Sequence, residues 1–352
     1  MTKHPAPIHK ILIVQTAFIG DVVLTLPLIQ QAASLFPESD VHVLTIPTSV
    51  PLVETHRDVR RVWVFKKRTE HRGVKALWRF ARQLKNEQFD LALVPHRSLR
   101  SALLVWLAGI PRRVGFDKSA GRWLFTDVIP YPTGVHEIER NLQLLRPFWE
   151  WNGERILPNI FFTEQDQDNV QHWLHQMNLQ DQEFIALAPG SIWATKRWLP
   201  ERFARLADQL IARGWPVVLI GGPEDKALAE RICSLAQHPI VNAAGEFSVR
   251  ESALLLKHAR LLVSNDSAPM HLAVAVRTPV VAIFGPTVPA FGFYPYGEND
   301  RVVEDTQLSC RPCGIHGHQE CPLGTHACMQ HVTVEMVLNA VEEMIHAEAE
   351  RR

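Results

Sequence analysis

Short apolar runs alternate with helix-like segments along the whole chain, and this alternation constrains the fold more than any other feature. Residues 10–14, 41–46 and 90–94 are continuous apolar runs, typical of strands that are covered on both faces. Residues 21–35, 78–86 and 98–108 carry the apolar periodicity of helices. Strands that alternate with helices predict a parallel sheet with crossover helices.

The same alternation restarts after a stretch at 130–160 that is rich in proline and glycine, a composition typical of a domain junction. Strand-like runs follow at 184–188, 216–220, 260–264 and 279–284, with helical segments at 200–213, 249–258 and 270–276. A chain of 352 residues is long enough for two cores. We therefore predict an α/β protein with Rossmann-like domains over 1–165 and 166–332. A C-terminal helix over 333–352 can pack back on the first domain.

Composition favours a cytoplasmic protein. No apolar run approaches the ~18 residues that a membrane-spanning helix needs. Residues 1–5 lack the apolar core of a secretory signal, and four of the five cysteines form one late cluster instead of a spread disulfide framework. The formal net charge is zero, yet residues 57–122 hold 17 Lys and Arg against 5 Asp and Glu. This local excess indicates either an anionic ligand or surface, or a solvated basic face.

The segment 262–273 has the strongest local signal for a binding site. A strand ends at Ser264, and a polar turn with Asp266 and Ser267 leads into a helix that starts near Ala268. Free N–H groups and the dipole of a helix N-terminus attract phosphate. A plain helix cap explains Asp266 or Ser267 alone, but it explains neither His271 one turn later nor the turn at 285–287 after the next strand.

Two further loops follow strands in the same half. In 188–198, Ser191 and Thr195 offer hydroxyls and Lys196 offers a cation for phosphate oxygens. In 221–225, two glycines precede Glu224, whose carboxylate suits ribose hydroxyls. Each loop alone is equally compatible with an ordinary turn.

Asp21 opens a helix after the first strand, in the segment 16–21. A carboxylate there is a helix cap by default. Its functional alternative is a general base that takes a proton from an acceptor hydroxyl. The position of Asp21 alone leaves both interpretations open.

The segments 11–27, 95–115, 188–198, 221–224 and 264–287 resemble those of the lipopolysaccharide core heptosyltransferases of glycosyltransferase family 9. Within that family the late segment with Cys310, Cys313, Cys321 and Cys328 is most similar to heptosyltransferase II. The resemblance implies a GT-B fold, in which two Rossmann-like domains have their parallel sheets facing a central cleft. It also implies transfer of heptose from ADP-L-glycero-D-manno-heptose to the first heptose of the inner core. Heptosyltransferases I and III, which act on other core acceptors, are the alternatives.

The resemblance also assigns roles to residues. Asp21 matches the base, and Lys196 matches a group that stabilises the departing diphosphate. The donor-binding positions are Ser191, Thr195, Lys196, Glu224, Asp266, Ser267, Ala268 and His271. The family inverts the anomeric centre without a metal or another cofactor. Because the matched base Asp21 lies in the first half and the donor-binding positions lie in the second, activity should require the two halves to close on each other.

The acceptor of this family is an anionic glycolipid, which gives the basic segment a purpose. The acceptor-binding candidates are Arg97, Arg100, Arg113 and Lys118. Residues 66–68, Lys-Lys-Arg, can contact the same acceptor or anionic lipid headgroups, so we also consider peripheral contact with the cytoplasmic face of the inner membrane.

Two other classes fit less well. A nicotinamide-dependent sugar-nucleotide dehydrogenase or epimerase predicts G-x-G-x-x-G after the first strand, where this chain has 16–21. A nucleic-acid-binding protein predicts an overall basic domain, whereas the net charge is zero. The four late cysteines, with His316, His318 and His326, resemble a zinc site. However, the last two cysteines lack the usual C-x-x-C spacing and the segment lies outside the donor loops, so we expect reduced thiols in a loop that packs near the domain interface.

Overall fold

The computed structural model describes residues 7–349, and within them the chain divides into two compact units between Phe161 and Phe162. We call them unit 1 and unit 2. The division lies close to the boundary that the sequence predicts after residue 165. The expectation that no secretory signal is present concerns residues 1–5, which lie outside the described part of the chain.

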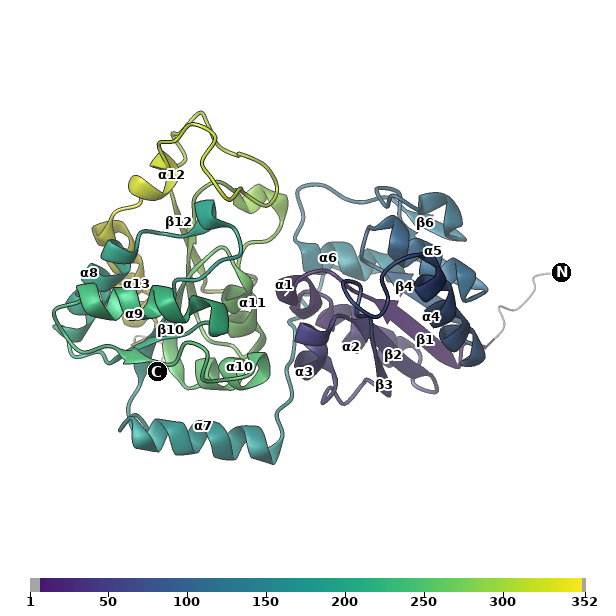
Figure 1. Ribbon diagram of the computed structural model, residues 1–352, viewed down its shortest axis with the longest axis horizontal. Helices are drawn as coiled ribbons and strands as arrows, with labels where there is room; N and C mark the ends of the chain where they lie inside the picture. Colours follow the sequence, from purple (N-terminus) through teal and green to yellow (C-terminus); the bar gives the residue numbers. More distant parts are fainter. Residues whose placement is uncertain (1–6, 350–352) are drawn as a thin grey trace. The chain divides into compact units, whose positions relative to one another are not determined.

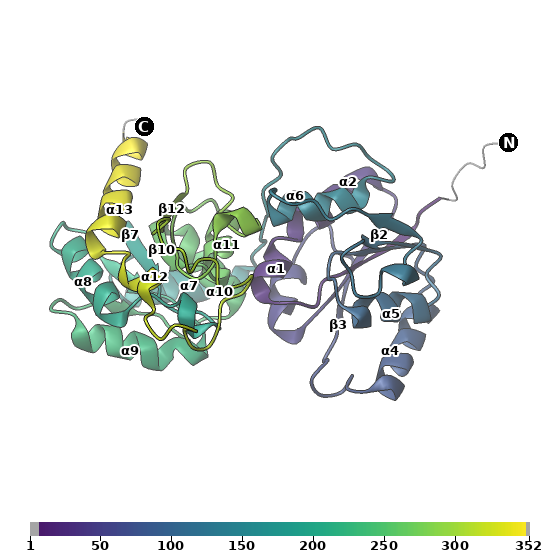
Figure 2. The same cartoon turned by 90° about the horizontal axis from the view of Figure 1, so that it is seen from above.

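Unit 1 contains a six-stranded, fully parallel sheet in the order β3-β2-β1-β4-β5-β6 (Figure 1). Its strands are β1 (Lys10–Val14), β2 (Asp40–Thr45), β3 (Arg61–Val64), β4 (Leu91–Val94), β5 (Arg112–Phe116) and β6 (Asp127–Ile129). Its helices are α1 (Ile19–Val23), α2 (Leu26–Leu35), α3 (Val50–Val53), α4 (Val74–Asn86), α5 (Leu99–Leu107) and α6 (Glu137–Leu142). Helices α2 and α6 cover one face of the sheet, and α4 and α5 cover the other (Figure 2).

Unit 2 has the same topology, with the strand order β12-β11-β10-β7-β8-β9. Its strands are β7 (Phe184–Ala188), β8 (Val217–Leu219), β9 (Val241–Asn242), β10 (Ala259–Asn265), β11 (Val280–Phe284) and β12 (Arg301–Glu304). Its helices are α7 (Glu164–Gln176), α8 (Pro200–Ile211), α9 (Lys226–Leu235), α10 (Val249–Lys257), α11 (Ala268–Ala275), α12 (Ala327–Gln330) and α13 (Val334–Ala349). The predicted two-domain α/β architecture with parallel sheets is therefore confirmed.

The strand order reverses between β1 and β4 in unit 1 and between β7 and β10 in unit 2. Chain connections leave such a neighbouring pair of parallel strands in opposite directions, which opens a crevice at their carboxyl ends. Each unit therefore has one switch point, and the loops after these four strands are the places where a ligand is expected.

Several elements differ from those that the sequence predicts. The apolar stretch 21–35 is two helices, because the chain turns at Leu24 and Thr25, where the Thr25 hydroxyl donates to the Asp21 carbonyl over 2.7 Å. The stretch 130–160 is not only a junction, since α6 begins within it. The edge strands β3 and β12 carry charged residues and lack a continuous apolar run, so the sequence does not reveal them.

Helix α13 belongs to the core of unit 2. Its residues Val334, Val337, Leu338, Val341 and Met344 are buried there beside α8 and the strands β11 and β12. A contact between this helix and unit 1 stays a prediction. None of the helices in the described part of the chain combines the length and apolar character needed to span a bilayer.

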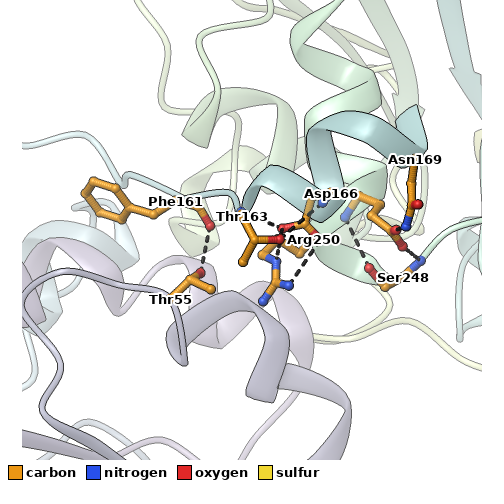
Figure 3. A network of polar contacts seen from close by, with 8 residues as sticks. Thr55, Phe161, Thr163, Asp166, Asn169, Ser248 and Arg250 are labelled. Carbon is orange, nitrogen blue, oxygen red and sulfur yellow. Dashed lines mark hydrogen bonds and ion pairs between the residues drawn. The ribbon is translucent and has the colours of Figure 1, made fainter. Parts of the chain in front are cut away.

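A buried ion pair joins α7 to α10 within unit 2 (Figure 3). Arg250 donates to both carboxylate oxygens of Asp166 over 2.7 and 3.0 Å, and Thr163 caps α7 by accepting from the Asp166 N–H. Burial alone would raise the pKa of Asp166, but the hydrogen bonds from Arg250 and Thr163 outweigh it and hold that pKa below its usual value. In unit 1, Thr55 donates to the Phe161 carbonyl over 2.7 Å (Figure 3).

Arg250→Ala should lower the free energy of unfolding of unit 2 by about 3 kcal/mol, because it leaves the Asp166 carboxylate buried and uncompensated. The matched control, Arg231→Ala, removes an exposed ion pair with Glu201 and should cost less than about 1 kcal/mol. Urea unfolding measures both. The contribution of Asp166 to the free energy of unfolding depends on pH. It is present above the usual carboxyl pKa of about 4, and it is lost as the pH falls through the lower pKa that Asp166 has in the folded state. Equal losses for the two variants would contradict this assignment.

Candidate functional site

The switch point of unit 2 holds a buried charged cluster, made of Lys196, Asp266 and Thr287. The Lys196 ammonium lies 2.5 Å from Asp266 Oδ2, and the Thr287 hydroxyl donates to the same oxygen over 2.6 Å. Lys196 follows β7, Asp266 follows β10 and Thr287 follows β11. The exposed fraction of each residue is below a tenth. Three loops that are distant in sequence thus share one carboxylate.

The start of α11, beside this cluster, presents polar atoms without protein partners. Ser267 is the N-cap residue but its hydroxyl makes no cap bond, and neither its Oγ nor His271 Nδ1 has a hydrogen-bond partner although both atoms are buried. Burial lowers the pKa of His271 to about 4, against the opposing effect of Asp266, so the ring is neutral near pH 7. Buried polar groups without partners are costly, and a polar ligand at the helix N-terminus would satisfy them.

Asn265 organises the loop that carries Lys196. Its side-chain oxygen accepts from the Trp198 N–H over 3.0 Å, and its amide donates to the Pro189 carbonyl over 2.8 Å. The residue is fully buried at the end of β10. The sequence predicts that Asn265 belongs to the polar turn, whereas the structure makes it the last residue of β10. Neither Asn265 nor Thr287 is among the predicted site residues, because only the tertiary structure shows that both side chains are buried and hydrogen-bonded there.

Asp225, and not the neighbouring Glu224, holds the loop after β8. A Cβ added to Gly190 would lie 2.3 Å from Asp225 Oδ1, so the missing side chain of Gly190 gives room to this carboxylate. Asp225 also accepts from the Gly222 N–H over 3.1 Å. Glu224 is exposed and lies over Gly222. Its predicted contact with a ribose stays a prediction.

Asp21 lies in the first turn of α1, just after β1, and accepts from the Phe18 N–H over 3.1 Å. Burial and the nearby Glu137 carboxylate raise the pKa of Asp21 to about 6, whereas the Phe18 N–H and Arg97 oppose the rise. A carboxyl with this pKa is ionised near pH 7 yet basic enough to accept a proton from a hydroxyl. The cap and the base are therefore compatible roles for one side chain.

A second polar cluster lies at the switch point of unit 1 and was not found from the sequence. His96, after β4, lies 2.8 Å from the Thr16 hydroxyl after β1 and 2.8 Å from the Ser101 hydroxyl in α5. Burial, with help from Lys67 and Arg97, lowers the pKa of His96 to about 4. The Lys67 ammonium donates to the Thr16 carbonyl over 2.7 Å. The Asp21 loop is thus anchored from two directions.

The four predicted acceptor-binding residues have different surroundings. Arg97 is half-buried over the Tyr131 ring at 4.5 Å and is close enough to Asp21 to influence its pKa. Arg100 donates to the carbonyls of Lys67 and His71, and Arg113 donates to the Leu124 carbonyl over 2.7 Å. Lys118 is exposed. The structure therefore brings only Arg97 to the neighbourhood of Asp21.

Comparison with known proteins now identifies the chain. The family model of glycosyltransferase family 9 (heptosyltransferase) matches residues 77–323, which include segments of both units. The chain belongs to glycosyltransferase family 9. It is therefore a glycosyltransferase.

Individual relatives agree with this family. Lipooligosaccharide heptosyltransferase 2 of Haemophilus influenzae is 26% identical over 358 residues, covering 96% of this chain and 99% of the relative. Lipopolysaccharide heptosyltransferase 1 of Pseudomonas aeruginosa is 28% identical and covers 86% of each chain. The solved structure of the Escherichia coli ADP-heptose heptosyltransferase II superposes with a TM-score of 0.79 at 23% identity, over 97% of this chain and 99% of that one. The last match confirms the GT-B fold.

The late segment 310–328 lies outside the donor loops in sequence, and in the structure it packs on the loops of the unit 2 switch point. The Thr195 hydroxyl donates to the His318 carbonyl and accepts from the His318 N–H, both over 2.8 Å. His316 stacks on Trp193, and Cys313 donates its N–H to the Pro286 carbonyl over 2.8 Å. Thr195 is thus occupied by protein contacts, whereas the Ser191 hydroxyl accepts one bond from the Trp193 N–H.

The four late cysteines line one cavity of about 230 Å³, together with Pro322, Leu323, Thr325 and Ala327. All four are free thiols. Burial raises the pKa of Cys328 to about 11, whereas the His326 N–H lowers the pKa of Cys321. Within residues 7–349, no group of three or more His, Cys, Asp or Glu side chains has an arrangement that could hold a metal ion.

Thr195→Val should loosen the segment 310–328, because it removes two hydrogen bonds to the His318 backbone. Each such bond contributes about 1 kcal/mol, so amide exchange in the segment should rise by about tenfold or more. Hydrogen–deuterium exchange with mass spectrometry measures this. Thr278→Val, which removes a buried bond to the Leu256 carbonyl in the same unit, is the matched control and should leave the segment unchanged. The same exchange rate in both variants would refute the anchoring role.

Proposed function

We propose that this glycosyltransferase moves heptose from ADP-L-glycero-D-manno-heptose to the first heptose of the lipopolysaccharide inner core. The observation that carries the proposal is the Lys196–Asp266–Thr287 cluster beside the unpartnered atoms Ser267 Oγ and His271 Nδ1 at the start of α11. A cation, a helix N-terminus and uncommitted polar atoms together suit a sugar diphosphate. We place the reaction on the cytoplasmic side of the inner membrane.

The proposed donor contacts divide by chemistry. Lys196, Ser191 and the backbone at Ser267 and Ala268 suit the diphosphate, because they offer a cation and hydrogen-bond donors. Asp266 and His271 suit sugar hydroxyls, and Glu224 suits the ribose. Thr195 acts indirectly in this scheme, since its hydroxyl already holds the His318 backbone.

Asp21 is the proposed base. The acceptor hydroxyl attacks the anomeric carbon, Asp21 takes its proton, and ADP departs from the opposite face, so the configuration inverts. Lys196 and the N-terminus of α11 stabilise the charge that develops on ADP. This electrostatic stabilisation requires no metal or other cofactor in the proposal.

The proposed acceptor contacts centre on Arg97, which is close to Asp21. Lys118 is exposed and offers a second cation to an anionic core. Arg100 and Arg113 remain candidates through any donors not used by the carbonyls that they already contact.

The choice of acceptor rests on similarity. The heptosyltransferase 2 of H. influenzae aligns over nearly the whole chain, and the cysteine segment resembles that of heptosyltransferase II. Heptosyltransferase I, similar at 28% identity in P. aeruginosa, or III, with different core acceptors, is the second candidate. A nicotinamide-dependent dehydrogenase is not favoured, because the family model matches most of the chain.

The acceptor is tested with ADP-heptose and two lipopolysaccharide cores, one lacking all heptose and one carrying the first heptose. We expect transfer only to the core that carries heptose. Lys196→Met should remove this activity, because the departing diphosphate loses its cation. Transfer only to the heptose-free core would overturn the proposed acceptor and favour heptosyltransferase I.

The activity should depend on the ionisation of Asp21. Because the pKa of its carboxyl is about 6, kcat/KM should fall about tenfold for each pH unit below that value and reach a plateau above it. Asp21→Asn should abolish this dependence along with most activity. This fall in kcat/KM at low pH is the acidic limb of the pH–rate profile, which is measured with the purified enzyme.

The variant Arg97→Gln distinguishes the ionisation of Asp21 from a general effect of mutation on stability. Arg97 opposes the rise in the pKa of Asp21, so its removal should move the acidic limb to higher pH. Arg122→Gln, at an exposed position in the same unit, is the control and should leave the limb in place. An acidic limb at the same pH in the Arg97 variant would contradict the assignment of Asp21.

A further inference from the structure

Three exposed tryptophans of unit 1 lie on neighbouring elements. Trp78 on α4 is 51% exposed, Trp106 on α5 is 48% exposed, and Trp123 on the short helix η2 (Arg122–Leu124) is 70% exposed. Val74 and Leu99, at the starts of α4 and α5, are also exposed. Large apolar side chains that gather on one surface commonly mark an interaction site.

These three elements are neighbours in space. Helix α4 packs against α5, and α5 packs against η2. A Cβ added to Gly121 would lie 2.5 Å from Ala102 Cβ, so η2 approaches α5 closely. Both views show α4 and α5 side by side (Figures 1 and 2). We call this the α4–α5–η2 surface.

The surface is also strongly basic. Helix α4 carries four cations and no carboxylate, and all four are exposed: Lys75, Arg79, Arg82 and Lys85. The Arg82 guanidinium lies 4.8 Å from the centre of the Trp78 ring, which joins a cation and an apolar ring at one point. Arg122 opens η2 and is exposed beside Trp123.

The basic triplet at 66–68 does not contribute in the same way. Lys66 pairs with Glu70 over 2.6 Å, and Lys67 donates to the Thr16 carbonyl. Two of the three cations are therefore engaged with the loops of unit 1. Other exposed cations lie further along the chain, on α4 and η2.

Alternating cations and exposed tryptophans match the interface of an anionic bilayer. Indole rings favour the headgroup level, where one edge is apolar and the other is hydrated, and each nearby cation gains from the negative surface potential. A nucleic acid would satisfy the cations, but it gives Val74 and Leu99 no apolar environment. The exposed apolar side chains therefore favour a lipid surface over a nucleic acid.

We propose that the α4–α5–η2 surface docks unit 1 on anionic phospholipid. This docking goes beyond the proposed function. It rests on that function only for the reason to dock, since a glycolipid acceptor would lie in the same membrane. Binding is peripheral and electrostatic in its first stage, so it weakens as salt screens the cations. The tryptophans then enter the headgroup region.

The full chain is tested by co-sedimentation with phosphatidylcholine vesicles, with and without phosphatidylglycerol. We expect binding only to the anionic vesicles, a loss with added NaCl, and a blue shift of tryptophan emission on binding. Arg79→Glu with Arg82→Glu should weaken binding by about tenfold or more. Trp78→Ser with Trp123→Ser should also weaken it and should reduce the blue shift.

Matched controls lie in unit 2. Lys257→Glu reverses an exposed helical charge, and Leu235→Gln removes an exposed helical apolar side chain, so both should bind vesicles as the unmodified chain does. Circular dichroism confirms that each variant is folded. Equal losses in the controls and in the surface variants would overturn the proposal, as would equal binding to neutral and anionic vesicles.

Two measurements keep this proposal separate from the proposed function. Thermal stabilisation by ADP reports the donor site, and the surface variants should retain it in full. Vesicle binding without ADP stabilisation would contradict the proposed function alone, whereas ADP stabilisation without vesicle binding would overturn the docking alone. The surface would be assigned to nucleic acid instead if the chain binds no vesicles but is retained on a single-stranded oligonucleotide, and if the same variants lose that retention.

Discussion

The ion pair between Lys196 and Asp266 is the interaction on which the rest of the candidate donor site depends. It joins the loops after β7 and β10 at the place where the strand order of unit 2 reverses. Because both groups are buried, loss of either would leave an uncompensated charge. Asn265 sets the path of the Lys196 loop, and Thr287 adds a second bond to Asp266. The loops beside Ser267 Oγ and His271 Nδ1, the unpartnered atoms at the start of α11, are therefore held together by these polar contacts.

The two units apply one topology to two kinds of chemistry. In unit 2 the switch point carries a cation and a helix N-terminus, which favour an anionic ligand. In unit 1 it carries a neutral histidine among hydroxyls, with a carboxylate of raised pKa in the next helix. The fold supplies equivalent positions after β1, β4, β7 and β10, and the residue types there decide what each position can do.

Secondary structure was predictable wherever burial leaves a clear pattern. The central strands β1, β4, β7, β10 and β11 are nearly continuous apolar runs because helices cover both faces. Edge strands such as β3 and β12 are half-exposed, so their sequences mix charged and apolar residues. The break between α1 and α2 was also missed, since it depends on the Thr25 side chain and not on periodicity.

The sequence by itself determined the two-domain α/β architecture, the family and the loops in which Asp21, Lys196 and Asp266 lie, because these follow from local patterns and motifs. Only the tertiary structure decided which side chains are already engaged. It paired Lys196 with Asp266, gave Thr195 to the His318 backbone, and brought His96 to Thr16. It also left Trp78, Trp106 and Trp123 exposed on the neighbouring elements α4, α5 and η2. Such contacts join residues far apart in the chain, and a linear pattern carries no information about which of them meet.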